Sequence, residues 1–264
     1  MHDRPTLSIV LPAFNEEEAI GGTVAQCLAA AAEIARQADL AGVEVLVVND
    51  GSTDRTSEIA RSHTGVRVID FPQNRGYGAA LAEGFRHARG ELLGFLDADG
   101  TCDPRQFGPL CRKLRDEQAD LVLGARLGPG SQMPWVRKLG NRFFAGLLSI
   151  LAGHRVTDIA TGMRVFRRDT LDRLGPLPTG LHYTPAMTSA ALLTGLRVVE
   201  EPIPYSVRLG KSKLRPIRDA LRFLRVILGS AARHRPGRLM LLVLLALLLL
   251  LAIEKGVRSI YWDN

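Results

Sequence analysis

Short apolar runs alternate with longer helical patterns along the first two-thirds of the chain. We interpret the apolar runs as buried strands, and they cover residues 7–11, 43–48, 67–71, 91–96 and 120–125. The helical patterns cover residues 17–36, a short stretch from about residue 53, residues 77–88 and a stretch that begins at Asp103 and Pro104. Asn15 is the expected N-cap of the first helix. Strands that alternate with helices in this way predict an α/β domain with a mostly parallel central sheet and helices on both faces.

The pattern changes after residue 210. Residues 211–238 are basic, and apolar residues recur three and four positions apart among the arginines (Ile217, Leu221, Leu224 and Leu228). This spacing predicts an amphipathic helix. Two surfaces are able to accept its apolar face: an anionic membrane or the folded domain itself.

Residues 239–253 carry no charge and consist mostly of leucine. A run that is apolar all round is typical of a membrane helix, although this one is shorter than the usual span of about 20 residues. Arg238 and Lys255 stand beyond its two ends, where long basic side chains reach lipid headgroups. We therefore predict a folded domain at residues 1–212, a basic juxtamembrane helix at 213–238, and a transmembrane segment with a short tail at 239–264.

Charge and cysteine content narrow the partners and the compartment. The chain has 264 residues, a net charge of +7 and a pI of about 9.8, which indicates an anionic partner. The basic residues concentrate beside the apolar tail, so we expect a membrane surface and no nucleic acid. Three cysteines without a C-x-x-C spacing argue against disulfides and a zinc site and favour a reducing compartment.

The two ends of the chain predict its orientation. The N-terminus has no apolar leader, and more positive residues precede the apolar tail than follow it. Both features predict a domain on the cytoplasmic side of the cell membrane, attached by a single-pass or monotopic helix.

Three polar clusters follow predicted strands. They span residues 12–16, 49–54 and 97–100, after the first, second and fourth apolar runs. In an open parallel sheet, ligands bind beyond the carboxyl ends of the strands. We therefore expect the three clusters to line one crevice.

Asp97 and Asp99 are the candidate metal ligands. Two carboxylates separated by one residue in extended geometry point the same way, and they repel each other unless a cation lies between them. A hard cation, Mg²⁺ or Mn²⁺, suits such a pair, with diphosphate oxygens as its further ligands. The metal would stabilise a leaving nucleoside diphosphate.

Asp50 and the glycine-rich turn at residues 74–78 are candidates for binding a nucleotide. Asp50 can accept hydrogen bonds from a base, or it can form an Asx-turn that supports Gly51. Asp54 is the better candidate for capping the following helix. The turn can hold phosphate at a helix N-terminus, but its spacing is not that of a P-loop or a dinucleotide fingerprint.

Taken in order, these motifs resemble glycosyltransferase family 2. They are P-A-x-N-E at residues 12–16, N-D-G-S-T-D at 49–54, N-R-G-x-G at 74–78 and D-A-D-G at 97–100. The resemblance covers about residues 7–213 and implies a GT-A fold, a nucleotide-sugar donor and inversion of the transferred sugar. It implies a metal on Asp97 and Asp99. The donor-binding residues that it implies are Pro12, Ala13, Asn15, Glu16, Asp50, Arg75, Gly76, Asp97, Ala98 and Asp99.

The second half of the chain resembles the dolichyl- and polyprenyl-phosphate sugar transferases of that family. The similar stretches are G-A-R at residues 124–126, T-D-I-A-T-G-M-R at 157–164 and R-L-G-K-S-K-L at 208–214. By this resemblance Arg126, Arg137, Arg208 and Lys213 would neutralise an acceptor phosphate, although each is also compatible with a solvated surface charge. Asp158 would align or deprotonate the acceptor; its alternatives are a helix cap and a partner for Arg164.

The resulting hypothesis is an inverting transferase that moves a sugar from a UDP- or GDP-sugar to dolichyl or undecaprenyl phosphate at the membrane. Transfer to another lipid or to a glycan hydroxyl stays open, and a hydroxyl acceptor would need a base. A nucleotide-sugar-binding protein without turnover is a further alternative. A nicotinamide dehydrogenase is disfavoured by the absence of a G-x-G-x-x-G motif. Homo-oligomerisation is left open.

Overall fold

The computed structural model describes residues 4–128, 130–210, 213 and 215–262, and it gives side chains as far as Glu254. Residues 211, 212 and 214 of the R-L-G-K-S-K-L stretch lie outside the described residues. The side chain of Lys255 and the end of the predicted tail lie outside them as well.

In the described part of the chain, seven strands form one sheet with the order β3-β2-β1-β4-β6-β5-β7. The pairs are parallel except those of β6, which runs antiparallel to both β4 and β5. The predicted mostly parallel sheet is therefore confirmed. Its strands are β1 (Thr6–Ala13), β2 (Gly42–Asn49), β3 (Val66–Asp70), β4 (Leu92–Leu96), β5 (Leu121–Ala125), β6 (Met163–Arg167) and β7 (Val198–Pro202).

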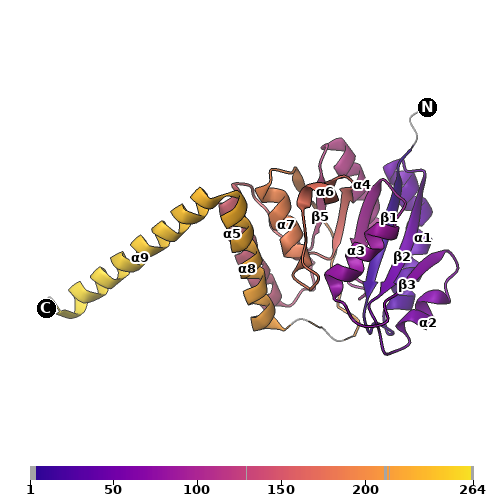
Figure 1. The fold of residues 1–264 in the computed structure, drawn as a ribbon, viewed down its shortest axis with the longest axis horizontal. Helices are drawn as coiled ribbons and strands as arrows, with labels where there is room; N and C mark the ends of the chain where they lie inside the picture. The colour runs from indigo at the N-terminus through magenta and orange to yellow at the C-terminus, as the bar shows by residue number, and fades with distance from the viewer. Residues whose placement is uncertain (1–3, 129, 211–212, 214, 263–264) are drawn as a thin grey trace.

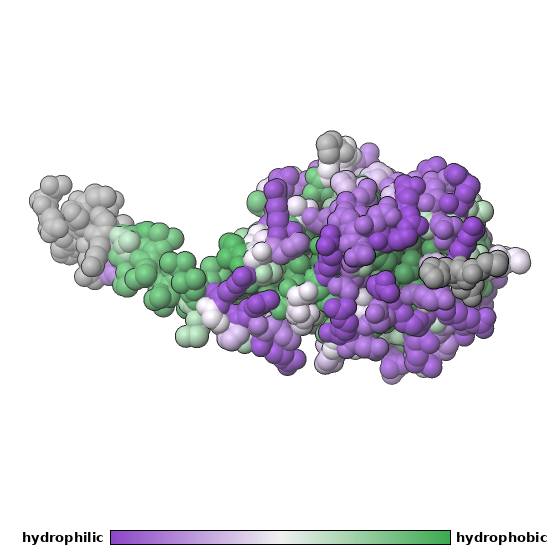
Figure 2. Space-filling model, turned by 90° about the horizontal axis from the view of Figure 1, so that it is seen from above, coloured by the Kyte–Doolittle hydropathy of each residue, from purple (hydrophilic) through white to green (hydrophobic). Residues whose placement is uncertain are grey.

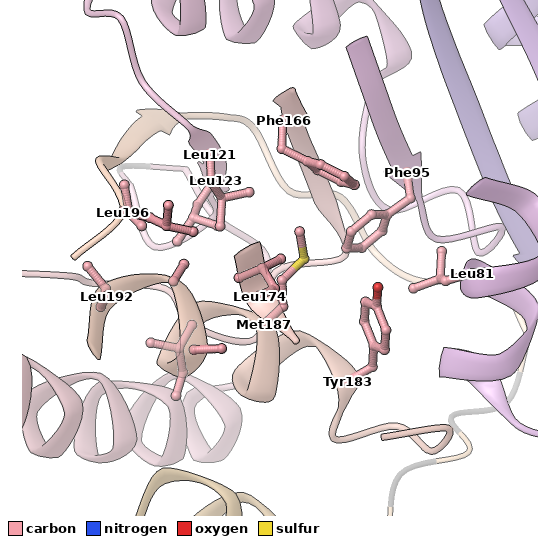
Figure 3. Packing of buried hydrophobic residues seen from close by; sticks show 14 of the residues in the cluster. Leu81, Phe95, Leu121, Leu123, Phe166, Leu174, Tyr183, Met187, Leu192 and Leu196 are labelled. Atoms are coloured by element: carbon pink, nitrogen blue, oxygen red, sulfur yellow. The ribbon is translucent and has the colours of Figure 1, made fainter. Parts of the chain in front are cut away.

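Helices cover both faces of the sheet because its strands are apolar on both sides. Along β1, Val10 packs with Phe85 in one core cluster, whereas Ile9 and Leu11 pack with Ile20 in the other. The first cluster lies under α3, α5 and α7, and the second under α1 and α4 (Figure 1). Figure 3 shows part of the first cluster. The helices of this layered body are α1 (Ile20–Ala38), α2 (Thr56–Arg61), α3 (Tyr77–His87), α4 (Phe107–Asp116), α5 (Trp135–Ala152), α6 (Thr170–Leu174) and α7 (Tyr183–Leu193).

Two expectations about the first strand and helix are wrong. The first strand does not end at residue 11 as expected, because β1 continues through Pro12 to Ala13. Strand β4 pairs with β1 only as far as Val10, so β1 has an open side where a proline is tolerated. Asn15 does not cap α1, which begins at Ile20. Asn15 has a φ of 50°, and its side chain accepts a hydrogen bond from the Thr53 N–H instead.

The basic segment forms α8 (Pro216–His234), which packs against the domain. Ile227 and Ala231 are fully buried in the first core cluster, and Phe223 meets Phe144 of α5 edge to face. The folded domain therefore accepts part of this helix, while Ile217 and several arginines stay exposed.

The last helix, α9 (Pro236–Trp262), projects from the body (Figures 1 and 2). Its window Pro236–Glu254 covers 19 residues, none of them buried, and is long and apolar enough to cross a membrane. The helix starts before the charge-free run at residues 239–253 and continues beyond it. It is therefore longer than the span of about 20 residues that a membrane helix needs.

Candidate active site

The three polar clusters meet at one edge of the sheet. They follow β1, β2 and β4, which are neighbours in the order β2-β1-β4 and run parallel. Parallel strands place their carboxyl ends at the same edge. The sheet topology therefore brings the three clusters to one edge.

Side chains at this edge tie the first two clusters together. The Asn15 N–H donates to Ser52 Oγ at 2.9 Å, and Asn15 Oδ1 accepts from the Thr53 N–H at 2.8 Å. The Glu16 N–H donates to Thr56 Oγ1. Asp54 accepts from the Thr56 N–H at 3.0 Å, so it serves the start of α2 as expected.

Asp50 holds the glycine-rich turn in place. Its carboxylate accepts hydrogen bonds from the N–H groups of Arg75 at 2.7 Å and Gly76 at 2.9 Å, and from Asn74 Nδ2 at 2.9 Å. Burial raises the pKa of Asp50 even though these hydrogen bonds oppose the shift. Asn49, rather than Asp50, accepts the Ser52 N–H within the turn.

Asp97 is fixed by two groups that come from distant elements. The Tyr77 hydroxyl at the start of α3 donates to Asp97 Oδ1 at 2.7 Å. Gly162 lies against the other oxygen: a Cβ at this position would be 1.8 Å from Asp97 Oδ2. The Asp97 N–H also donates to the Gly162 carbonyl. The T-G-M-R stretch therefore shapes the pocket of Asp97.

Asp99 is buried and held on both sides. Its Oδ1 accepts hydrogen bonds from the N–H and hydroxyl of Thr101, and its Oδ2 accepts from Arg208 Nη1 at 2.8 Å. Ala98 between the two acids is buried as well.

The donor set fits a hard divalent cation. Burial and then the charge of Asp99 raise the pKa of Asp97 to about 6, as expected where two carboxylates share a site. No hydrogen bond from the described residues reaches Asp97 Oδ2. Among those residues, no group of three or more histidine, cysteine or acidic side chains is arranged so that it could hold a metal ion. Two carboxylates alone leave ligand positions for diphosphate and water, which is how Mg²⁺ is commonly bound.

Arg208 and Lys213 reach across this edge from the segment after β7. Arg208 forks between two acids, with Nη1 on Asp99 and Nη2 on Glu16 Oε1 at 2.7 Å. Lys213 Nζ pairs with the same Glu16 oxygen at 2.6 Å and also donates to the Phe14 carbonyl. These cations neutralise acids of the first and third clusters.

Arg137 lines a cavity of about 220 Å³ beside Arg208. Gln132, Tyr205 and Ser206 contribute to the same walls. Within the described chain Arg137 has no ion-pair partner. Two of the four predicted acceptor-side cations, Arg137 and Arg208, therefore open onto one cavity.

Arg126 and Asp158 bind each other instead. Arg126 Nε and Nη2 donate to the two oxygens of Asp158 at 2.8 and 2.9 Å, and Asn141 donates to Asp158 Oδ1. Asp158 is fully buried. Burial alone would raise its pKa, but the Arg126 charge and the hydrogen bonds outweigh burial and lower it. The base role expected for Asp158 finds no support in this enclosed position.

The sequence assigned no role to Tyr77 or Gly162, and it offered Arg164 only as an alternative partner for Asp158. Arg164 is fully buried, donates to the carbonyls of Ile159 and Thr161, and so holds the loop that carries Gly162. It is not the partner of Asp158. Tyr77 and Gly162 lie inside quoted motifs, but their contacts with Asp97 join segments that are distant in sequence.

Solved structures with a similar fold carry nucleotide-sugar chemistry. Glucosyl-3-phosphoglycerate synthase from Mycobacterium tuberculosis, in complex with Mn²⁺, UDP and phosphoglyceric acid, has a TM-score of 0.65 at 23% identity, over 86% of this chain and 78% of that chain. S. aureus TarS 1-349 in complex with UDP-GlcNAc has a TM-score of 0.63 at 20% identity, over 87% and 67% of the chains. The chain therefore has the GT-A fold.

The chain belongs to glycosyl transferase family 2, whose model matches residues 8–175. Among its relatives, a dolichyl-phosphate hexose transferase of Haloferax volcanii is 37% identical over 80% of this chain and 87% of the relative. The low-salt glycan biosynthesis hexosyltransferase Agl6 of the same organism is 36% identical over 86% of this chain, which spans only 54% of that relative's length. The dodecaprenyl-phosphate galacturonate synthase of Rhizobium johnstonii is 27% identical over 88% of this chain and 69% of the relative.

Proposed function

We propose that the chain is an inverting, metal-dependent transferase that moves a sugar from a nucleotide sugar onto a polyprenyl phosphate at the membrane. The observation that carries this proposal is the fork of Arg208, which joins the acids of the sheet edge to the cavity beside Arg137. Two polyprenyl-phosphate enzymes among the relatives support the acceptor class.

The donor would lie along the carboxyl ends of β1, β2 and β4. The turn held by Asp50 carries Arg75 and Gly76, and the exposed Arg75 side chain would reach the donor phosphates. Residues 12–16 would form the opposite wall. UDP and GDP are both candidate nucleotides of the donor.

Asp97 and Asp99 would hold Mg²⁺ or Mn²⁺, which supplies positive charge to stabilise the departing diphosphate. Tyr77 orients Asp97 and leaves its Oδ2 free, and Thr101 orients Asp99. These neighbours hold the carboxylates in place before the donor arrives. Arg208 would release Asp99 Oδ2 when the metal and the donor diphosphate bind.

The acceptor phosphate would enter the cavity lined by Arg137 and Arg208. A phosphate oxygen attacks the anomeric carbon, a new carbon–oxygen bond forms, and the bond to the diphosphate oxygen breaks on the opposite side. The acceptor is already ionised near neutral pH, so it needs no base. The cations reduce the repulsion between the phosphate and the donor diphosphate.

We assign Arg126 and Asp158 a positioning role, because they neutralise each other in a buried position and do not line this cavity. A hydroxyl acceptor would require an accessible base, and Asp158 is enclosed. The buried pair therefore favours a phosphate acceptor over a hydroxyl. Helix α9 would hold the domain at the membrane, with the domain on the cytoplasmic side; self-association is not required.

The test uses the full chain with Mn²⁺ or Mg²⁺, undecaprenyl or dolichyl phosphate, and a panel of UDP- and GDP-sugars. Lipid-linked sugar and released nucleoside diphosphate are both measured. We expect one donor to react, EDTA to abolish transfer, and Asp97→Ala to do the same.

The variant Arg137→Ala tests whether Arg137 binds the acceptor phosphate. A change in the KM for the lipid alone distinguishes this role from a loss of overall enzyme activity. Loss of charge-assisted hydrogen bonds to phosphate costs about 1.5–3 kcal/mol, so the KM for the lipid should rise about tenfold or more while the KM for the donor is unchanged. Arg36→Ala, on the exposed face of α1, is the matched control. Transfer to a hydroxyl acceptor alone would overturn the acceptor assignment, and no donor turnover with any acceptor would overturn the proposal as a whole.

A further inference from the structure

Glu200 of β7 holds the loop that carries Asp158. Its Oε1 accepts hydrogen bonds from the N–H groups of Thr157 and Asp158, each at 2.8 Å, and its Oε2 accepts from the Thr157 hydroxyl at 2.9 Å. Hydrogen bonds to an ionised acceptor are roughly twice as strong as those between neutral groups. One carboxylate therefore fixes both the backbone and a side chain of this loop.

The neighbouring acid, Glu201, makes a different contact. Successive residues of a strand point to opposite faces of the sheet, and Glu201 pairs with Lys113 of α4 at 3.0 Å. Strand β7 is an end strand of the sheet in the described chain, and charged side chains on such strands commonly prevent pairing with other chains. Glu201 fits that use, whereas the Glu200 carboxylate is occupied by the loop before β6.

The loop is connected to two walls of the acceptor cavity. Asp158 pairs with Arg126, whose Cζ lies 5.3 Å from the centre of the Tyr205 ring. Asp158 Oδ1 also accepts a hydrogen bond from Asn141 of α5 at 2.9 Å. Tyr205 lines the cavity, and so does Arg137, which lies about one helical turn before Asn141. The restraint that Glu200 places on the loop therefore reaches both walls.

We propose that Glu200 is a positioning residue for the acceptor phosphate. It does not line the acceptor cavity itself but acts through Asp158, which holds Arg126 against Tyr205 and Asn141 on α5. Buried polar networks of this kind are rigid while their members are satisfied. Without the carboxylate, two backbone N–H groups lose their acceptor, and the walls of the cavity are no longer held. The inference rests on the proposed function, which assigns this cavity to the phosphate.

Steady-state kinetics of the full chain with undecaprenyl or dolichyl phosphate test this role. In Glu200→Ala the KM for the lipid should rise at least about fivefold, as is common for residues that are coupled to a site without touching it, while the KM for the nucleotide sugar stays the same. Glu200→Gln keeps an oxygen for the two N–H groups, so its KM should lie between those of Glu200→Ala and the native chain. Glu201→Ala is the matched control on the opposite face of β7 and should leave both KM values unchanged.

A second measurement does not depend on turnover. The chain has four tyrosines, so fluorine NMR of the full chain labelled with fluorotyrosine gives few signals, and Tyr205→Phe identifies the signal of Tyr205. In Glu200→Ala this signal should shift, because the Arg126 charge that faces the ring moves. In Glu201→Ala it should stay in place.

An unchanged Tyr205 signal in Glu200→Ala would overturn the proposal. Equal rises in the KM for the lipid and for the donor, or an equal effect of Glu201→Ala, would overturn it as well, because both results indicate a general loss of stability. A shifted signal in a native chain background that transfers no sugar would reject the proposed function and keep the connection from Glu200 to the cavity. Sugar transfer by Glu200→Ala with a normal KM for the lipid would reject the positioning role alone.

Discussion

Gly162 offers the sharpest test of how the metal-site carboxylates are held. In Gly162→Ala the new Cβ would lie 1.8 Å from Asp97 Oδ2 and 2.1 Å from its Cγ, so Asp97 must move. We expect Mn²⁺ affinity to fall at least about tenfold, which corresponds to about 1.4 kcal/mol. Electron paramagnetic resonance of free Mn²⁺ measures this without relying on turnover.

Gly22→Ala is the control for this substitution. Gly22 lies inside α1 with nothing within 4 Å of an added Cβ, so it should gain about 0.5–1 kcal/mol of stability and bind Mn²⁺ as before. Normal Mn²⁺ affinity in Gly162→Ala would show that Asp97 does not contribute to the metal site.

The buried Arg126–Asp158 pair predicts a pH-dependent loss of stability. Asp158→Asn leaves Arg126 without its counter-charge, which should cost about 3–5 kcal/mol. Because Arg126 holds the pKa of Asp158 below its usual value of about 3.9, its contribution is present above that pH and lost as pH falls through the lower folded-state pKa. Urea unfolding in detergent measures the free energy of unfolding of the native chain and of Asp158→Asn. The difference between the two should be constant near neutral pH and should become smaller in acid.

Arg36→Ala removes an exposed ion pair of α1 and should cost less than about 1 kcal/mol. An equally small cost for Asp158→Asn at neutral pH would contradict the positioning role of the pair.

At the scale of elements, α8 has one buried face and one exposed face. Its sequence left open whether the membrane or the folded domain covers its apolar face. In the structure, Ile227 and Ala231 are buried in the core of the domain. We therefore propose that the folded domain extends through α8 instead of ending at residue 212.

The two faces of α8 can be separated by matched substitutions. Ile227→Ala should lower the free energy of unfolding by about 2–5 kcal/mol, since it empties a fully buried site. Ile217→Ala removes the same atoms from a side chain that is 79% exposed and should change stability by less than about 0.5 kcal/mol. Thermal unfolding in detergent compares the two; equal effects would show that α8 is not part of the core.

At the scale of the whole molecule, α9 should affect access to lipid more than the site itself. A chain that ends at Arg235 keeps the sheet edge intact, and we expect its donor affinity to be unchanged. Its transfer to polyprenyl phosphate in vesicles should fall at least about tenfold, because the tether no longer concentrates the domain at the bilayer. In detergent the tether is not needed, so the truncated and the full chain should transfer sugar to the same lipid equally well. Full activity of the truncated protein on vesicles would contradict the role of α9.

The sequence by itself determined the alternating architecture, the three polar clusters and the apolar tail. Local periodicity fixes these features, because each strand or helix must present apolar residues at its own repeat. It did not reveal β6 and β7. In β6 a fully buried arginine, Arg164, interrupts the apolar pattern, and only the carbonyls of a neighbouring loop make that burial tolerable.

Only the tertiary structure decided which polar residues meet. The sequence predicts that Arg126 neutralises an acceptor phosphate and that Asp158 aligns or deprotonates the acceptor. In the structure they pair with each other, because β5 and the loop before β6 converge. Tyr77 and Gly162 shape Asp97 across separations that no local pattern encodes. On α5, the core packs against Ala145 and Leu148, so Trp135 and Phe143 on the other side of the helix stay exposed. A sequence records which side chains are present, whereas packing decides which of them remain free to bind.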